Sequence, residues 1–304
     1  LRRLLDQLDE LAVEPRDRVH ALQSRVDYQM IRKERLDEAL ALQQRVVAQA
    51  TEVGWDWLRV AGALNVAVLH ASLGDHEDAV RVAERLLPEA RRWPALPERC
   101  TLLAKAGYVF SRAEQVQRAA ALFDESVSEA LACGAHAMAI SALGHVAHAR
   151  LRLGQPETAL AAIVRADALC AAHDGVEGAS DSSHYMAALA LRLLGRYDEA
   201  LVRVHAAIDV ARARVAFDLF GTFVVRAGIW LDLGQHARAL QDRAQAKREA
   251  RAPGKEHELV LLDLRLAAEG NARPRDDAVR GHALLEGDAL PFLKLCASLR
   301  LVDL

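Results

Sequence analysis

The chain has 304 residues, of which 52% are hydrophobic, and a formal net charge of −3. This slightly acidic balance argues against a general nucleic-acid binder, which usually carries a basic surplus. No run of 18 or more apolar residues is present, and the opening LRRLLDQLDE is charged where a signal peptide would be apolar. The sequence therefore predicts neither a membrane span nor a secretory leader.

The composition favours helix. Ala and Leu dominate the hydrophobic residues, and aromatic residues make up only 5% of the chain. Ala and Leu are good helix formers, whereas β-branched and aromatic side chains lose rotamer freedom in a helix. The four cysteines form no C-x-x-C pair, so we expect reduced thiols in a cytoplasmic protein. They are Cys100, Cys133, Cys170 and Cys296.

After a leading helix over residues 1–13, one pattern recurs along the chain. Segments such as LGDHEDAV, LGQPETAL, LGRYDEAL and LGQHARAL place an alanine at the same phase. Successive alanines are 40, 40, 40, 41, 39 and 39 residues apart, which is the signature of a repeat architecture. The alanines are Ala39, Ala79, Ala119, Ala159, Ala200, Ala239 and Ala278.

Each repeat predicts two helices joined by a tight turn. Five residues before the alanine, four repeats carry a glycine, which ends a helix because it adopts a left-handed conformation without strain. The residue twelve positions before the alanine is mostly small, so the two helices can approach closely. The four glycines are Gly74, Gly154, Gly195 and Gly234, and the other three repeats have Glu34, Glu114 and Arg273 in that slot. The small residues are Ala67, Gly107, Ala147, Ala188 and Ala227, with Asp27 and Leu266 in the terminal repeats.

The pattern predicts an all-α, right-handed superhelix of about seven helix-turn-helix repeats, because a lone hairpin cannot bury its apolar face. We expect one domain over residues 1–304, with a capping helix over 289–303. The links 93–97 and 174–183 are the longer connections, and we interpret both as surface loops. The chain begins with Leu1, so we expect it to be a piece of a longer protein. The predicted repeats are 18–53, 57–92, 98–132, 136–173, 182–214, 217–251 and 256–286.

The G-x-[YHP]-x-x-A core resembles the tetratricopeptide repeat (TPR), and the resemblance covers nearly the whole chain. The ordinary TPR has 34 residues, whereas these repeats have about 40. Long, Ala- and Leu-rich repeats are similar to the superhelical C-terminal domain of MalT-like, ATPase-linked bacterial transcription regulators. That resemblance implies a domain that receives an inducer or a protein partner.

No catalytic or cofactor motif is present. The sequence lacks G-x-S-x-G, H-E-x-x-H and a P-loop, so we predict no enzyme and no cofactor. His145 and His148 share a helix face with His136 upstream, but two ligands on one helix are too few, and we predict no metal site. The basic stretch from Arg238 to Lys255 is interleaved with acidic residues, which is typical of a solvated helix face. We expect no direct nucleic-acid binding by this region.

In TPR folds the first helices of the repeats, here called A helices, line a concave groove. Carried onto this sequence, the groove slots predict a basic and aromatic surface that suits an anionic ligand, such as an acidic helix or a peptide ending in a carboxylate. The sixth repeat adds Asp232. The predicted binding residues are Tyr28, Arg32, Asn65, Lys105, Tyr108, Arg112, His145, His148, Arg152, Tyr185 and Arg192.

The functional prediction is a protein-, peptide- or ligand-binding superhelix that forms the sensory or interaction domain of a bacterial transcription regulator. The alternative is a stand-alone scaffold or adaptor for protein assembly. We expect a protein or peptide partner, or a small-molecule inducer, in the groove. The sequence predicts no membrane association and leaves homo-oligomer formation open.

Overall fold

The computed structural model describes residues 2–32, 36–94, 96–173, 183–213 and 219–250, together with residues 259, 262 and 263. These residues form thirteen α-helices and contain no strand. The chain divides into two compact units, residues 1–183 and 184–304, and each is described here by itself. No helix in this described part of the chain is both long and apolar enough to cross a bilayer.

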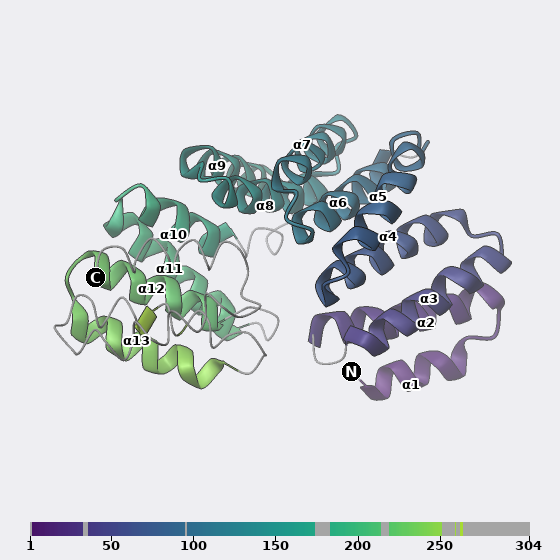
Figure 1. Ribbon diagram of the computed structural model, residues 1–304, viewed down its shortest axis with the longest axis horizontal. Coiled ribbons are helices and arrows are strands. Elements are labelled where there is room, and N and C mark those ends of the chain that lie inside the picture. The colour runs from purple at the N-terminus through teal and green to yellow at the C-terminus, as the bar shows by residue number, and fades with distance from the viewer. Residues whose placement is uncertain are drawn as a thin grey trace. The chain divides into compact units, whose positions relative to one another are not determined.

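Unit 1 consists of a leading helix and four helical hairpins, coloured purple to teal in Figure 1. Each A helix packs against its own second helix, here called the B helix, and against neighbouring repeats, as α4 does with α3, α5 and α6. The leading helix α1 spans Arg2–Leu11 and packs on α2. The hairpins are α2 (Pro15–Arg32) with α3 (Leu36–Glu52), α4 (Asp56–Leu73) with α5 (His76–Arg91), α6 (Leu96–Arg112) with α7 (Val116–Ala132), and α8 (His136–Arg152) with α9 (Pro156–Ala172).

Unit 2 contains two further hairpins of the same kind. Helix α12 packs against both α11 and α13. The hairpins are α10 (Ser183–Leu193) with α11 (Tyr197–Ala213), and α12 (Leu219–Asp232) with α13 (His236–Glu249). The six predicted repeats from 18–53 to 217–251 begin and end within three residues of the observed hairpins. The predicted seventh repeat and capping helix lie outside the described residues, apart from helical positions 259, 262 and 263.

The turns confirm the role assigned to the glycine slot. Gly74 follows α4 with φ = 101°, a left-handed conformation, and its amide donates to a carbonyl of the preceding turn. Glu114 occupies the same slot in the third repeat and has φ = 61°, the one positive φ of a non-glycine residue among those described. A residue with a Cβ is strained in this conformation, so the turn after α6 carries a local cost that glycine avoids elsewhere.

The phased small residues are buried where the helices cross. All six repeat alanines in the described residues are 0% exposed, from Ala39 to Ala239. In the third repeat Gly107 faces the ring of Phe123, whose nearest carbon lies 2.8 Å from the position that a Cβ on residue 107 would take. The small slot on the A helix therefore allows a large core side chain from the B helix to pack onto the backbone.

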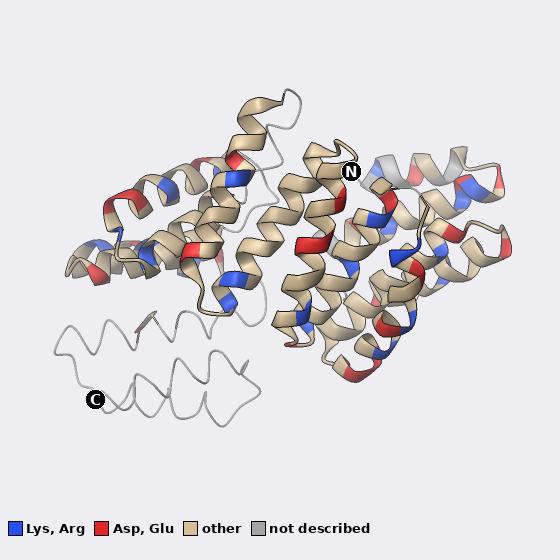
Figure 2. Ribbon diagram, turned by 90° about the horizontal axis from the view of Figure 1, so that it is seen from above, with Lys and Arg blue, Asp and Glu red and all other residues tan. Residues whose placement is uncertain are grey.

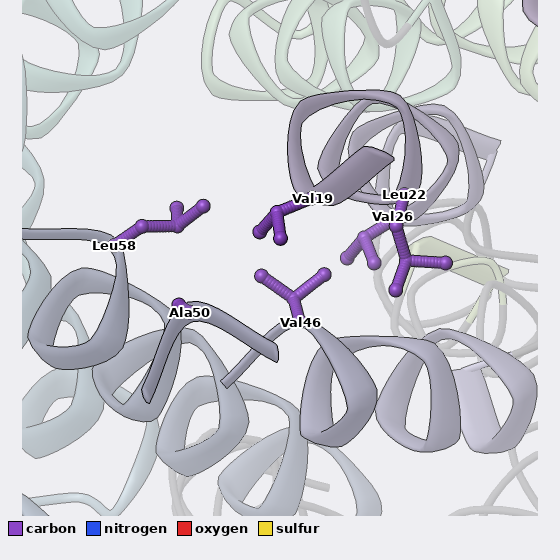
Figure 3. Packing of buried hydrophobic residues seen from close by; sticks show 6 residues of the cluster. All are labelled: Val19, Leu22, Val26, Val46, Ala50 and Leu58. Carbon is purple, nitrogen blue, oxygen red and sulfur yellow. The ribbon is translucent and has the colours of Figure 1, made fainter. Parts of the chain in front are cut away.

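Larger apolar side chains fill the space between hairpins. In unit 1, Figure 3 shows Val46 and Ala50 of α3 facing residues of α2 and α4. Trp55 and Trp57, at the junction between α3 and α4, pack against this cluster. The full cluster comprises Val19, Leu22, Val26, Val46, Ala50 and Leu58.

Charged residues of both signs are interspersed along the helices (Figure 2). On the B helices of unit 1, Arg91 on α5 pairs with Glu125 on α7 at 2.9 Å, and Arg118 on α7 pairs with Glu84 on α5 at 2.8 Å. These pairs are largely exposed, so each contributes less than about 1 kcal/mol.

Candidate functional site

The repeat brings groove-slot residues of successive A helices into register. Asn65, Lys105 and His145 are 40 residues apart and lie on α4, α6 and α8 of unit 1. The contacts described below connect them with further residues of α6 and α8. We call this set the A-helix face, and it comprises Asn65, Lys105, Tyr108, Arg112, His145, His148 and Arg152.

A chain of buried amides leads to Lys105. The Lys105 ammonium donates to Asn65 Oδ1 at 2.6 Å, and Asn65 Nδ2 donates to Gln43 Oε1 at 3.2 Å. Gln43, which is 0% exposed, donates in turn to Gln23 Oε1 at 3.0 Å. Burial lowers the pKa of Lys105, and the charge of Asp27 partly opposes that shift. Within the described residues the ammonium hydrogen-bonds to an amide oxygen and forms no ion pair, and Asp27 is the acid whose charge acts on it.

A second cluster surrounds Tyr108. The guanidinium of Arg112 lies 5.5 Å from the centre of the Tyr108 ring, and its Nη2 donates to the phenol oxygen at 3.4 Å. The ring of His145 meets Tyr108 edge-on at 5.8 Å and stacks on Phe123 at 5.1 Å. Arg112 is exposed and, in the part of the chain described, forms no ion pair. This cluster therefore presents a cation beside an aromatic ring. The imidazole of His145 packs edge-on against the same ring.

Within the described residues, the guanidinium of Arg152, unlike that of Arg112, forms an ion pair. One of its nitrogens donates to the backbone oxygen of Ser111 at 2.7 Å, and another forms an ion pair with Glu114. Both acceptors belong to the end of α6 and the turn after it. Arg152 therefore satisfies a terminal helix carbonyl and neutralises a neighbouring acid, rather than presenting a free charge.

The two histidines of this face favour the neutral form. Burial lowers the pKa of His145. The pKa of His148 is lowered to about 4, first by desolvation and then by the positive charges of Arg152, His145 and Arg112. At neutral pH the positive charge of the A-helix face therefore comes from lysine and arginine, while the imidazoles supply neutral donors and acceptors.

These shifts predict a pH dependence of stability. Because both imidazoles have lower pKa values in the folded chain than the ordinary 6.5, the unfolded chain takes up protons first as the pH falls. The stabilising contribution of the neutral His148 is complete above about pH 6.5 and is lost as the pH falls towards about 4. We expect His148→Gln to reduce the drop in urea midpoint between neutral and acidic pH. The exposed His76→Gln serves as the control, and equal drops in both variants would contradict the assignment.

The remaining predicted residues lie elsewhere. Tyr28 is half-buried on α2, and the side chain of Arg32 lies outside the described residues. In unit 2, Tyr185 is half-buried on α10, and Arg192 Nε bonds to Asp232 Oδ2 at 2.6 Å. The Arg192 guanidinium also packs against Gly228, where any Cβ would meet it at 2.3 Å. The structure thus places seven predicted residues on α4, α6 and α8 of unit 1, where contacts join Lys105 to Asn65 and join Tyr108 to Arg112 and His145. In unit 2 it pairs Arg192 with Asp232.

His136, which the sequence places upstream of His145 and His148 on the same helix, makes its ring contact at the start of α8 and not with the A-helix face. His136 stacks on His173, with ring centres 3.5 Å apart, at the open end of the α8–α9 hairpin. Among the described residues, no three His, Cys, Asp or Glu side chains are grouped so as to hold a metal ion.

Comparison with known proteins identifies the fold. The sequence matches no family profile, and no curated protein matches it. Solved structures do match. A Rap protein complexed with competence and sporulation factor has a TM-score of 0.63 at 13% identity, over 99% of this chain and 79% of that chain. NprR in complex with its cognate peptide NprX has a TM-score of 0.60 at 12% identity, over 89% and 81%.

A tetratricopeptide repeat protein from Parabacteroides merdae has a TM-score of 0.57 at 15% identity, over 93% of this chain and 98% of that chain. At such low identities the likeness establishes architecture alone. The fold is that of tetratricopeptide repeat proteins, an all-helical solenoid of stacked hairpins, as the repeat spacing predicted. The narrower likeness to MalT-like regulators stays a prediction.

Proposed function

We propose that this chain is a peptide- or protein-binding TPR module and that the A-helix face of unit 1 binds an acidic, extended segment of its partner. The observation that carries the proposal is the pair of cations on α6. Lys105 and Arg112 each lack a carboxylate partner among the described residues, and Tyr108 lies between them on the same helix face. Cations that form no ion pair in the described residues and lie beside an aromatic ring suit carboxylates attached to a chain.

The spacing of the two cations suggests a preferred ligand. Lys105 and Arg112 are seven residues apart on α6, which corresponds to about 10.5 Å along the helix axis. In a peptide extended as a polyproline II helix, which has three residues per turn and a rise of about 3.1 Å per residue, residues three apart lie on the same side and are separated by about 9 Å. A segment with acidic residues at positions i and i+3 would therefore place one carboxylate near each cation and rest its backbone across Tyr108.

The fold neighbours support a binding role. The Rap protein was solved in complex with competence and sporulation factor and NprR in complex with its cognate peptide NprX, and both share the helical fold described above. We extend the proposal to the sensory or interaction part of a bacterial regulator acting in the cytoplasm, without a catalytic step of its own. The alternative function, a stand-alone adaptor, would bind its partner through the same A-helix face and the same cations.

Fluorescence anisotropy with the full chain tests the proposal. The probes are labelled ten-residue alanine-based peptides with two glutamates at i and i+3, with two adjacent glutamates, or with two lysines at i and i+3. We expect the first to bind most tightly. Arg112→Glu and Lys105→Met should each weaken it by at least about tenfold, which corresponds to about 1.4 kcal/mol.

The matched control is Arg85→Glu, which removes an exposed arginine from the B helix α5. This variant should bind the best peptide as the parent chain does. Equal loss in the control, or equal affinity for the glutamate and lysine peptides, would show that the A-helix face is not the binding surface.

A further inference from the structure

A second basic feature lies at the other end of unit 1, in a pocket of about 380 Å³ between the start of α2, the middle of α3 and the turn after α1. This volume falls within the range of small-molecule sites, about 300–1,000 Å³. The pocket shares no lining residue with the A-helix face. Three arginines and three apolar residues define its chemistry: Arg18, Arg25 and Arg45, with Ala21, Leu22 and Leu42.

Of the three arginines that line the pocket, only one forms an ion pair with an acid in the described residues. Arg25 pairs with Asp6 at 3.0 Å. Arg18 reaches only the backbone oxygen of Ala12, at 3.4 Å, and Arg45 is exposed without an ion pair in the described residues. Among the described residues that line the pocket, none carries a carboxylate. With only one of its three guanidinium groups in an ion pair within the described residues, the pocket suits an anion, because a guanidinium presents a planar fork of donors that matches phosphate or carboxylate.

The rest of the lining is apolar. Ala21 and Leu22 are 2% and 9% exposed, and Leu42 is half-buried beside them, so one wall of the pocket cannot bond to a polar ligand. The turn that supplies Ala12 also carries Leu11 and Val13, which are 76% and 68% exposed. These two exposed apolar side chains flank Ala12, a residue of the pocket lining, along the chain.

We propose that this pocket binds an anionic amphiphile, a molecule with a phosphate or carboxylate head and an alkyl chain. Arg18 and Arg45 hold the head, and the chain lies along Ala21, Leu22 and Leu42 towards Leu11 and Val13. A site for a simple anion would not need the apolar wall, and a site for a purely apolar molecule would not need the arginines. The same headgroup chemistry occurs in a free amphiphile and in a bilayer lipid.

Titration calorimetry on the full chain tests the proposal with octyl phosphate below its micelle concentration, inorganic phosphate and octanol as probes. We expect octyl phosphate to bind at least about tenfold more tightly than either fragment, because only it engages both walls. Arg18→Glu and Arg45→Glu should each weaken it by about tenfold or more, as expected for loss of a charged hydrogen-bond donor. Leu42→Asn should weaken octyl phosphate but not inorganic phosphate.

Arg85→Glu is again the control, since it changes the net charge equally on an exposed helix face outside the pocket. Circular dichroism melting of each variant confirms that it is folded. Co-sedimentation with phosphatidylglycerol vesicles separates the sources: binding lost in Arg45→Glu but not in Arg85→Glu assigns the headgroup to a bilayer, and calorimetric binding alone assigns a free molecule. Inorganic phosphate as tight as octyl phosphate, or no binding in either arm, would overturn the proposal.

Discussion

Replacing Phe123 with alanine is expected to lower the free energy of unfolding of unit 1 by about 3–5 kcal/mol, the usual cost of removing a buried aromatic ring. Phe123 is 1% exposed, packs onto the backbone at Gly107 and stacks on His145. The cavity left behind would lie where α6, α7 and α8 meet, so both neighbouring repeats lose packing. Urea unfolding followed by circular dichroism measures the change.

The pairing of Phe123 with Gly107 gives this prediction an internal control. Gly107→Ala alone should destabilise the chain, because its new methyl group meets the ring at 2.8 Å. In a Phe123→Ala background the same change should cost less or nothing, since the obstructing ring is gone. The two costs should therefore be non-additive by more than about 0.5 kcal/mol. Simple additivity would contradict the close contact.

Asp242→Ala should have a comparable effect in unit 2. Arg226 donates to both carboxylate oxygens of Asp242, at 2.8 and 2.6 Å. The side chains are only 19% and 6% exposed. Removing one partner of a buried ion pair leaves the other charge unpaired, which typically costs about 3–5 kcal/mol. Thermal or urea unfolding of the variant against the parent chain measures this loss.

Asp78→Ala is the matched comparison, because Asp78 pairs with Arg81 on the exposed side of α5. An exposed pair is worth less than about 1 kcal/mol, so this variant should unfold almost as the parent does. Replacing both members of the buried pair, as Arg226→Met with Asp242→Leu, should recover most of the stability lost by Asp242→Ala. A small effect of Asp242→Ala would show that Arg226 is well solvated.

The fold followed from the sequence because its determinants are local and repeated. An alanine every 40 residues or so and a glycine five residues earlier place the turn in each hairpin without knowledge of distant contacts. The same arithmetic located Glu114 in the glycine slot, and its φ of 61° shows that the turn keeps its shape when the preferred residue is missing. The predicted seventh repeat lies outside the described residues.

The candidate site was only partly predictable. Repeat register correctly brought Lys105 beside Asn65 and His145 beside Tyr108. Register does not reveal which cations are neutralised, because that depends on side chains reaching between repeats. Arg152 and Arg112 occupy equivalent slots, yet only Arg152 meets a carboxylate, that of Glu114. Gln43 was missed for a similar reason: nothing in its B-helix context indicates that it is buried beneath Asn65.

The proposed binding surface can be tested by crosslinking from one position on the A-helix face. A photoreactive benzoylphenylalanine in place of Tyr108, on the A helix α6, should crosslink to the labelled peptide with glutamates at i and i+3. The same group in place of Ser128, exposed on the B helix α7, should not. Crosslinking at 108 that is abolished by unlabelled peptide is the result we predict. Crosslinking at 128, or at neither position while the peptide remains bound, would contradict the assignment of the A-helix face as the binding surface.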